Sequence, residues 1–447
     1  MRTQIFFAST LYGAATLAAA LDAGCFEGAD QRLLLVSNNA GNPETAPALD
    51  AMPGFARLRD RFDRVLSWNE TIRPFHPSGW SPRPDDAPLW ERYLRSLWGL
   101  GDGPGDDVVL VLESLQVEPA LAVARLFADA PVDVYADGLM SYGPTRNKLD
   151  PLVGGRVRRL LHLDLVPSLA PLLLTEFGVA AELVPTDAFR AVLADLSGDV
   201  PPSVTRAPHG GALLLGQYLS ALDILTGDEE EELHLRMLRG AAARGHGEVV
   251  FKPHPLAPAR YSRTLEKEAG ELGVGLTVLT APVLAETLYA RMRPALVVGC
   301  FSTALLTASA FYGLPVARTG TRQLLERVAP YQNSNRIPVT LVDALLPDLD
   351  AATGAGFRPV AGAELSGLVR AVGFCMQPQI LPHLRPEAER YLTEHLSPAT
   401  RRYFKRRRLT ALALPGAVPR QFAFVPRSPA VRRVARRARA LKRATLG

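Results

Sequence analysis

Cysteine is scarce in this chain of 447 residues, which contains three, Cys25, Cys300 and Cys375. They are too few and too widely spaced for a disulfide framework or a zinc site. Long apolar runs are missing as well, because no uninterrupted stretch reaches the roughly 18 to 20 residues that a membrane-spanning helix needs. We therefore expect a globular protein of the reducing cytoplasm.

The opening apolar run, residues 5–21, lacks a strongly basic start and contains Tyr12 and Thr16. It also divides at Ser9-Thr10 into a strand-like half and a helix-like half. We interpret it as a first strand and helix rather than as a signal peptide.

Two common nucleotide-binding motifs are also absent, Gly-x-Gly-x-x-Gly and the Walker phosphate loop. This weakens a dinucleotide or ATP-hydrolysis interpretation. The one Asp-x-Asp, Asp348-Leu349-Asp350, follows Pro347 in an expected loop, and the acidic run at 228–232 is typical of a solvated helix start. Since neither predicts a metal site, we expect no metal and no cofactor.

Positive charge is unevenly distributed along the chain. Residues 401–447 contain fifteen Lys or Arg and no Asp or Glu, whereas the formal net charge of the whole chain is +5. The rest of the chain therefore carries a net charge of −10, and the basic total says nothing about an active site.

Strand-like and helix-like segments alternate along most of the chain, which is the pattern of parallel sheets joined by helical crossovers. Expected strands of the first half are residues 4–8, 32–37, 63–66, 108–112 and 132–135, and those of the second half are 212–217, 248–251, 276–279, 295–299 and 314–317. We predict an α/β fold of two Rossmann-like domains that face each other. The expected limits are 1–205 for the first domain, 212–345 for the second, 346–400 for closing helices and 401–447 for a basic tail.

The carboxyl ends of strands are where open α/β sheets bind ligands. Asp137 follows the expected strand 132–135 and precedes Gly138, where its carboxylate could accept a proton from a hydroxyl. An ordinary Asp-Gly turn would explain the same residues. Farther along, Ser141, Tyr142 and Arg146 are candidates for holding a sugar, as are Ser9 and Thr10 after the first strand.

Lys252-Pro253-His254-Pro255 follows the second-half strand 248–251. The prolines restrict the backbone and place the imidazole at a strand end, where it could stabilise charge on a leaving phosphate. Lys252 would face the same way in extended geometry and add a second positive charge. A histidine that merely caps a Pro-rich turn is the alternative.

Ser302-Thr303 opens an expected helix after the strand 295–299, and hydroxyls at a helix start can bind phosphate or simply cap the helix. Gly216-Gln217 ends the first strand of the second half and could line a nucleotide pocket. Glu286 is a weaker candidate for binding a ribose. These residues complete the expected nucleotide site.

Taken together, these motifs and their order resemble the bacterial sialyltransferases of GT-B fold, most closely the α-2,8-polysialyltransferase family, over roughly residues 1–345. The opening Ile5-Phe6-Phe7-Ala8-Ser9-Thr10, the segment from Asp137-Gly138 to Ser141-Tyr142, and the later Lys-Pro-His-Pro and Ser-Thr motifs carry the likeness. The family motif usually has two acidic residues before the glycine, and Ala136 stands at the first of these positions.

The resemblance implies a metal-independent, inverting transfer of sialic acid from CMP-sialic acid to a glycan hydroxyl. Asp137 would act as general base, His254 would assist the departure of CMP, and Ser302-Thr303 would hold its phosphate. Lys-Pro-His-Pro also occurs in CDP-glycerol and Kdo transferases of surface polymer assembly, so such a donor is an alternative. A catalytically silent scaffold with a basic arm is another.

The basic tail 401–447 could contact anionic lipid at about 1 kcal/mol per basic residue near the surface. An acidic glycan would suit it too, and a solvated tail without a partner is equally consistent with the composition. We expect a nucleotide-sugar donor and a glycan acceptor as partners and no nucleic acid. The expected location is the cytoplasm, with peripheral attachment at the inner face of the membrane if the tail binds lipid.

Overall fold

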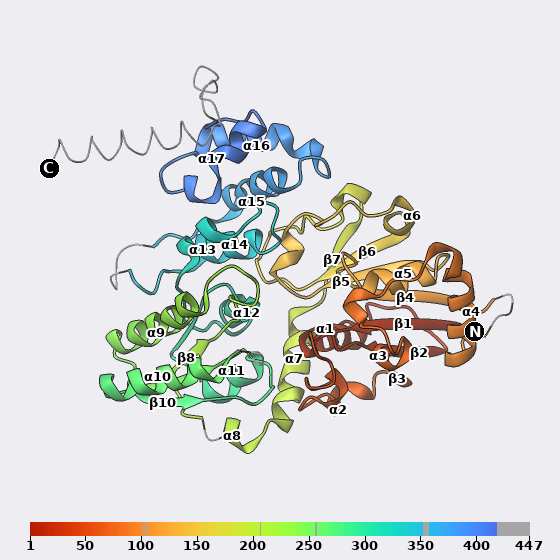
Figure 1. Cartoon of the computed structure of the whole chain (residues 1–447), viewed down its shortest axis with the longest axis horizontal. Coiled ribbons are helices and arrows are strands. Elements are labelled where there is room, and N and C mark those ends of the chain that lie inside the picture. Colours follow the sequence, from red (N-terminus) through yellow and green to blue (C-terminus); the bar gives the residue numbers. More distant parts are fainter. Residues whose placement is uncertain (102, 104, 206, 255–256, 352–356, 418–447) are drawn as a thin grey trace.

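The computed structural model describes residues 1–101, 103, 105–205, 207–254, 257–351 and 357–417. Within these residues two parallel sheets with helices packed around them form the protein (Figure 1). We call the part built on the first sheet the N-terminal lobe and the part built on the second the C-terminal lobe. The sheets lie inside residues 1–205 and 212–345, which we propose as the domain limits.

The N-terminal sheet has seven strands in the order β3-β2-β1-β4-β5-β6-β7, all of them parallel. Its strands are β1 (Arg2–Ala8), β2 (Gln31–Val36), β3 (Arg64–Ser67), β4 (Asp107–Glu113), β5 (Val132–Ala136), β6 (Val157–His162) and β7 (Ala180–Leu183). Alternate residues of β1 serve two cores: Ile5 and Phe7 are in one buried cluster and Phe6 and Ala8 are in the other. The sheet is therefore covered on both faces, as parallel sheets are.

The C-terminal sheet has five parallel strands in the order β10-β9-β8-β11-β12. They are β8 (Ala212–Leu215), β9 (Glu248–Lys252), β10 (Gly275–Val278), β11 (Leu296–Gly299) and β12 (Val316–Arg318). In both sheets the carboxyl ends of the central strands carry the residues that the sequence singles out.

The helices follow the alternating pattern. Those of the N-terminal lobe are α1 (Leu11–Asp22), α2 (Ala56–Arg59), α3 (Trp68–Thr71), α4 (Ala87–Trp98), α5 (Ala120–Leu126), α6 (Pro151–Gly154), α7 (Thr186–Leu196) and α8 (Pro202–Thr205). Those of the C-terminal lobe are α9 (Gly227–Ala243), α10 (Ala259–Leu272), α11 (Glu286–Met292), α12 (Thr303–Tyr312), α13 (Thr321–Arg327) and α14 (Arg336–Leu345). α15 (Gly362–Met376), α16 (Arg385–His395) and α17 (Arg406–Ala411) follow, at the top of Figure 1.

Helix α7 joins the two lobes. The ring of its Phe189 lies 5.2 Å from the ring of Tyr12 on α1 and 6.0 Å from the ring of Phe311 on α12. One buried apolar cluster includes residues of both sheets. The lobes therefore share packed apolar surface beside the site described below.

All ten strands predicted from the sequence are present, and two more, β6 and β7, were not predicted. β6 begins with Val157-Arg158-Arg159, and both arginines form ion pairs with the buried Asp133 of β5. β7 is an exposed edge strand. Neither segment shows the uninterrupted apolar run that marks a central parallel strand, because β6 contains two arginines and β7 is exposed to solvent.

The later helices return toward the N-terminal lobe. The Gln377 side chain after α15 donates to the backbone oxygen of Arg146, at 2.5 Å. A side chain at Gly373 would lie 2.6 Å from Leu172, so α15 approaches the N-terminal lobe closely.

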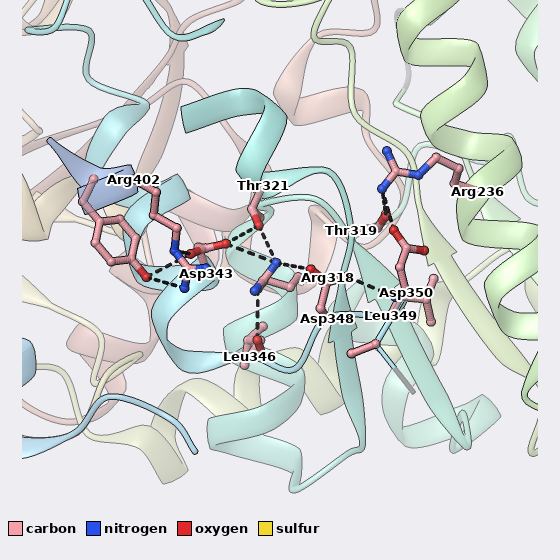
Figure 2. Close-up of polar contacts among 12 residues, drawn as sticks. Arg236, Arg318, Thr319, Thr321, Asp343, Leu346, Asp348, Leu349, Asp350 and Arg402 are labelled. Carbon is pink, nitrogen blue, oxygen red and sulfur yellow. Dashed lines mark hydrogen bonds and ion pairs between the residues drawn. The ribbon is translucent and has the colours of Figure 1, made fainter. Parts of the chain in front are cut away.

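Residues 401–417, expected to begin a basic tail, are folded against the C-terminal lobe. Arg402 forms an ion pair with Asp343 at 2.7 Å, and the Tyr403 hydroxyl donates to the same carboxylate at 2.9 Å. Asp343 also pairs with Arg318 at 3.1 Å, as Figure 2 shows. Of the fifteen basic residues, six lie in 401–417 and nine in 418–447, outside the described residues.

Candidate active site

The lobes touch where the predicted motifs meet. The segment after β5 lies against the start of α12: the backbone N–H of Leu139 points to the Thr303 hydroxyl at 3.5 Å, and a side chain at Gly138 would lie 3.2 Å from the same hydroxyl. Nearby, the hydroxyl of Tyr12 on α1 and that of Thr307 on α12 are 3.2 Å apart. Residues from sequence-distant halves of the chain thus share one site.

Asp137 is half-buried directly after β5. The Thr10 hydroxyl hydrogen-bonds its carboxylate, and burial raises the pKa of Asp137 more than this hydrogen bond lowers it. Gly13 provides the room: an added Cβ there would lie 3.0 to 3.2 Å from the Tyr135 hydroxyl, the Thr10 hydroxyl and Asp137 Oδ2. The result is an oriented carboxylate with a raised proton affinity, which suits a general base.

Ser9 and Thr10, predicted to touch a sugar, are engaged within the protein. The Ser9 hydroxyl and backbone N–H both donate to the carboxylate of Glu113 at the end of β4, at 2.5 Å and 3.0 Å. Thr10 caps α1 by accepting from the N–H of Gly13 at 2.9 Å. Sequence reasoning missed Glu113, although a carboxylate directly after a predicted strand at this sheet edge was a usable signal.

Lys252 and Glu286 are buried together in the C-terminal lobe. Burial raises the pKa of Glu286 to about 7, while the charge of Lys252 lowers it and that of Asp137 raises it. Burial also lowers the pKa of Lys252, and Glu286 opposes that change. Glu286 therefore interacts electrostatically with the lysine of its own lobe and with Asp137 of the other lobe.

His254 lies two residues beyond Lys252, the last residue of β9, and its side chain is exposed. Its ring lies 6.2 Å from that of Tyr218. Partial desolvation lowers the pKa of His254, the charge of Lys252 lowers it further, and Glu230 opposes both. Asp137 is thus linked to His254 through a series of electrostatic neighbours, Glu286 and then Lys252.

Gly216-Gln217 joins the ends of three neighbouring strands. The Gly216 N–H donates to the Lys252 oxygen at 2.9 Å, and Gln217 Oε1 accepts from the N–H of Phe301 at 2.9 Å. A Cβ at Gly216 would lie 2.9 Å from Phe251 and 3.1 Å from Pro253. The close approach of two backbones explains the glycine, and it fixes the segment that carries His254.

Glu230 anchors the next part of that loop. This fully buried carboxylate accepts from the N–H of Leu219 at 2.5 Å and from the N–H and hydroxyl of Ser220 at 3.0 Å and 2.7 Å. The sequence predicted a solvated helix start for the run 228–232. That holds for Asp228 and Glu232, which are exposed, whereas Glu229 forms a capping box with Thr226 at the start of α9 and Glu230 turns inward.

Ser302 and Thr303 begin α12 as predicted. Ser302 is the N-cap, and its hydroxyl accepts from the N–H of Ala304 at 3.3 Å. Both side chains are partly exposed. The helix start lies beside Gly138, so a phosphate bound there would be close to the Asp137 segment.

The candidate sugar-binding residues after Asp137 divide into two groups. Ser141 and Tyr142 are buried, with the Ser141 hydroxyl donating to the Gly138 oxygen at 2.9 Å and the Tyr142 hydroxyl accepting from the N–H of Val166 at 3.1 Å. They stabilise the 3₁₀ helix η4 (Leu139–Tyr142) and do not face outward. Arg146 is exposed and bridges the lobes by donating to the Ser334 hydroxyl at 2.7 Å.

A cavity of about 780 Å³ opens beside η4, between the lobes. Met140 and Arg146 line it from the N-terminal lobe and Leu222 and residues 332–335 from the C-terminal lobe. Its polar side chains are amides, a hydroxyl and the cations of Arg146 and Lys148, without a carboxylate. Asp137 and His254 do not line this cavity, so the cavity is separate from these two predicted residues.

Both carboxylates of Asp348-Leu349-Asp350 are engaged by arginines. Asp348 pairs with Arg318 at 2.8 Å and Asp350 with Arg236 at 2.6 Å (Figure 2). No cluster of three or more His, Cys, Asp or Glu side chains that could hold a metal ion occurs among the described residues. In the part of the chain that the structure describes, no helix combines the length and apolarity needed to cross a bilayer.

The model of the family described as alpha-2,8-polysialyltransferase (POLYST) matches residues 4–321, about seven tenths of the 447 residues. No individual curated protein matches the sequence.

Solved structures with a related arrangement share little sequence with this chain. The GT-B domain of a sialyltransferase from Photobacterium damselae is 12% identical, with a TM-score of 0.41, covering 76% of this chain and 96% of that one. A UDP-GlcNAc 2-epimerase from Methanocaldococcus jannaschii is 12% identical, with a TM-score of 0.43 and coverage of 71% and 83%. UGT2 of Phytolacca americana is 12% identical, with a TM-score of 0.41 and coverage of 90% and 97%.

Proposed function

The chain belongs to the alpha-2,8-polysialyltransferase family, and on that premise we propose that it moves sialic acid from CMP-sialic acid to a glycan hydroxyl with Asp137 and His254 as its catalytic residues. It is a glycosyltransferase of the sialyltransferase type with two parallel-sheet lobes of GT-B type. The observation that supports the proposed roles is the contact between the lobes, where the segment after Asp137 meets the start of α12 and the Leu139 N–H lies 3.5 Å from the Thr303 hydroxyl.

Asp137 is the general base of the proposed reaction. Its carboxylate accepts the proton of the acceptor hydroxyl while the hydroxyl oxygen attacks the anomeric carbon of the sialic acid. The bond from that carbon to the phosphate oxygen breaks, and the configuration at the carbon inverts. A raised pKa supports this role because a carboxylate with higher proton affinity is a stronger base.

The C-terminal lobe stabilises the departing CMP. Its phosphate gains negative charge as the bond breaks, and His254, Lys252 and the start of α12 with Ser302-Thr303 supply positive charge and hydrogen-bond donors. Lys252 is held in place by burial and by Glu286. We propose that these protein groups make a divalent ion unnecessary; full activity in the presence of EDTA would support this.

The cavity beside η4 is the proposed site for the acceptor. It adjoins the Asp137 segment through Met140, and its amides and hydroxyl match the hydrogen-bonding groups of a sugar. Arg146 is the one predicted sugar-binding side chain that lines it. Ser9, Thr10, Ser141 and Tyr142 form hydrogen bonds within the N-terminal lobe and do not line the cavity.

The basic tail is proposed to bind an anionic membrane surface. Its nine Lys or Arg beyond residue 417 are unaccompanied by acidic residues. Vesicles of phosphatidylcholine with phosphatidylglycerol should carry the full chain in flotation at low salt and release it at high salt. Equal flotation of a chain ending at residue 417 would refute the proposal.

Donor profiling tests the reaction itself. The full chain is incubated with CMP-sialic acid, CMP-Kdo, CDP-glycerol and UDP-sugars together with a panel of glycan acceptors, and release of the free nucleotide is measured. We expect acceptor-dependent release of CMP from CMP-sialic acid. Turnover of CDP-glycerol or CMP-Kdo in its place would identify a different donor and contradict the proposal.

A further inference from the structure

Glu113 is a charged side chain that interacts electrostatically with the proposed base and that the reaction scheme does not use. It is the last residue of β4 and lies beside Tyr135 of β5, two residues before Asp137. Because the two strands are parallel neighbours, Glu113 and Asp137 emerge at the same edge of the sheet.

Both carboxylate oxygens of Glu113 bind Ser9. Oε1 accepts from the Ser9 hydroxyl at 2.5 Å, and Oε2 accepts from the Ser9 backbone N–H at 3.0 Å. The Tyr135 hydroxyl lies 3.4 Å from Oε2 while it donates to the oxygen of Phe7 at 2.9 Å. Two hydrogen bonds to one residue restrain it more tightly than either would alone, so the position of Ser9 depends on Glu113.

Ser9 in turn controls the position of Thr10, the residue that touches the base. The Thr10 hydroxyl makes both contacts: its oxygen accepts from the N–H of Gly13, and the hydroxyl hydrogen-bonds the carboxylate of Asp137. The Thr10 hydroxyl, the Tyr135 hydroxyl and Asp137 Oδ2 surround Gly13 so closely that even a Cβ there would contact all three. A shift of the turn at Ser9 would therefore change the hydrogen bond that orients Asp137.

Charge links the same residues. Burial raises the pKa of Glu113 to about 7, the two hydrogen bonds from Ser9 lower it, and the charge of Asp137 raises it. The groups facing Glu113 are Ser9 from the turn after β1, Tyr135 from β5, and Asp137 directly after β5. Below pH 7 the protonated Glu113 adds no charge beside Asp137, and above pH 7 its carboxylate does.

We propose that Glu113 is a positioning residue of the transfer reaction, which holds Ser9 and Thr10 in the arrangement that orients Asp137. The proposal rests on the proposed function, because it concerns the base of that reaction. Glu113 itself does not touch the acceptor or the donor.

Four variants of the full chain test this role: Glu113→Ala, Glu113→Gln, Ser9→Ala and, as a matched control, Glu182→Gln. Glu182 is on edge strand β7 of the same sheet, where it pairs with Arg159 at 3.0 Å. The readouts are kcat, the KM for CMP-sialic acid, and the dependence of kcat/KM on pH between 5.5 and 8.5. Circular dichroism verifies that each variant is folded.

We expect Glu113→Ala to lower kcat about 10- to 100-fold with little change in the donor KM, since a misplaced group affects the transition state most. Ser9→Ala should lower kcat less. A fifth variant, which combines Glu113→Ala with Ser9→Ala, should have the same kcat as Glu113→Ala, because both substitutions act through one contact. Glu113→Gln retains an acceptor for the Ser9 N–H, so it should recover much of the rate. It should also remove the part of the pH dependence near 7 that Glu113 contributes, whereas Glu182→Gln should match the wild type throughout.

A wild-type kcat and pH profile in Glu113→Ala would overturn the proposal while leaving the proposed function intact. If Glu113→Ala does not fold, the decision passes to the two milder variants: an unchanged pH profile in Glu113→Gln together with an unchanged kcat in Ser9→Ala would overturn it equally. Failure of the wild-type chain to release CMP from CMP-sialic acid would instead overturn the proposed function, and the role of Glu113 with it.

Discussion

Asp343 of α14 is the centre of the ion-pair network in Figure 2. Its replacement by alanine should lower the free energy of unfolding of the C-terminal lobe. The Asp343 side chain is 1% exposed. It accepts from the hydroxyls of Thr321 at 2.6 Å and Tyr403 at 2.9 Å, and it pairs with Arg318 at 3.1 Å and Arg402 at 2.7 Å. The alanine variant leaves Arg318, itself 6% exposed, with Asp348 as its remaining ion-pair partner.

The expected cost follows from this burial. Removing one partner of a buried ion pair costs about 3–5 kcal/mol when the other charge is left uncompensated; because Asp348 still pairs with Arg318 at 2.8 Å, the cost of Asp343→Ala should lie toward the lower end of this range. Asp350→Ala is the matched control, because it removes the pair with Arg236 in which the two side chains are 46% and 34% exposed. A solvent-exposed pair is worth about 0–1 kcal/mol, so the two variants should differ by several kcal/mol.

Hydrogen exchange is the appropriate assay. All four tryptophans, at 68, 80, 90 and 98, are in the N-terminal lobe, so intrinsic tryptophan fluorescence does not report directly on the C-terminal lobe. The most protected amides of α14 and β12 should exchange faster by roughly two to four powers of ten in Asp343→Ala, and by less than about one in Asp350→Ala. Equal, small changes in both variants would refute the argument from burial.

Four further predictions concern residues of the candidate active site and the cavity beside it. Gly13→Ala places a Cβ within 3.2 Å of three polar atoms around Asp137 and should lower kcat about tenfold or more while CMP still binds; an unchanged kcat would contradict it. Gly216→Ala pushes against Pro253 and should weaken CMP binding in calorimetry, with Gly198→Ala, which meets nothing within 4 Å, as the neutral control. Arg146→Ala should raise the acceptor KM with little effect on the donor KM, and a changed donor KM alone would refute the acceptor site. Burial raises the pKa of Glu286 to about 7, so its carboxylate becomes charged as pH rises through 7 and offsets the positive charge of Lys252. The affinity for CMP should therefore fall between pH 6 and 8, and it should fall more in the wild type than in Glu286→Gln. Both proteins are measured at each pH, so that the titration of CMP itself cancels.

The C-terminal limit of the folded body matters for any truncation. A chain ending at residue 400 loses Arg402 and Tyr403, two of the partners of Asp343, and should be less stable than a chain ending at 417. Thermal unfolding of the two chains checks this, and equal midpoints would contradict it. A membrane-binding comparison should therefore use the longer truncation.

Buried central strands were predictable from the sequence, since a parallel strand covered on both faces needs a continuous apolar run, as β4 and β9 have. The exposed edge strand β7 carries no such requirement and was missed. The positions of Asp137 and His254 just beyond the ends of β5 and β9 were predictable in the same way. Whether a side chain faces outward was not: Ser141 and Tyr142 turn inward because the short helix η4 follows Gly138, and local sequence does not encode that direction.

Glu113 and Glu230 show the other limit. Each is a carboxylate whose role depends on a backbone amide brought to it by the fold, from Ser9 in one case and from Leu219 and Ser220 in the other. The sequence predicted a solvated helix start around Glu230 and gave no prediction for Glu113. The three-dimensional contacts show that Glu113 holds the turn at Ser9 and that Glu230 holds the loop at 219–220.

The most direct test of the central claim is the turnover of Asp137→Asn with saturating CMP-sialic acid and acceptor, measured as CMP release and compared with the wild type. The substitution preserves shape and removes the proton acceptor. The account predicts a kcat lower by about 10²- to 10⁴-fold, with CMP binding unchanged in calorimetry. A kcat within a few-fold of the wild type would show that Asp137 is not the base and would contradict the account.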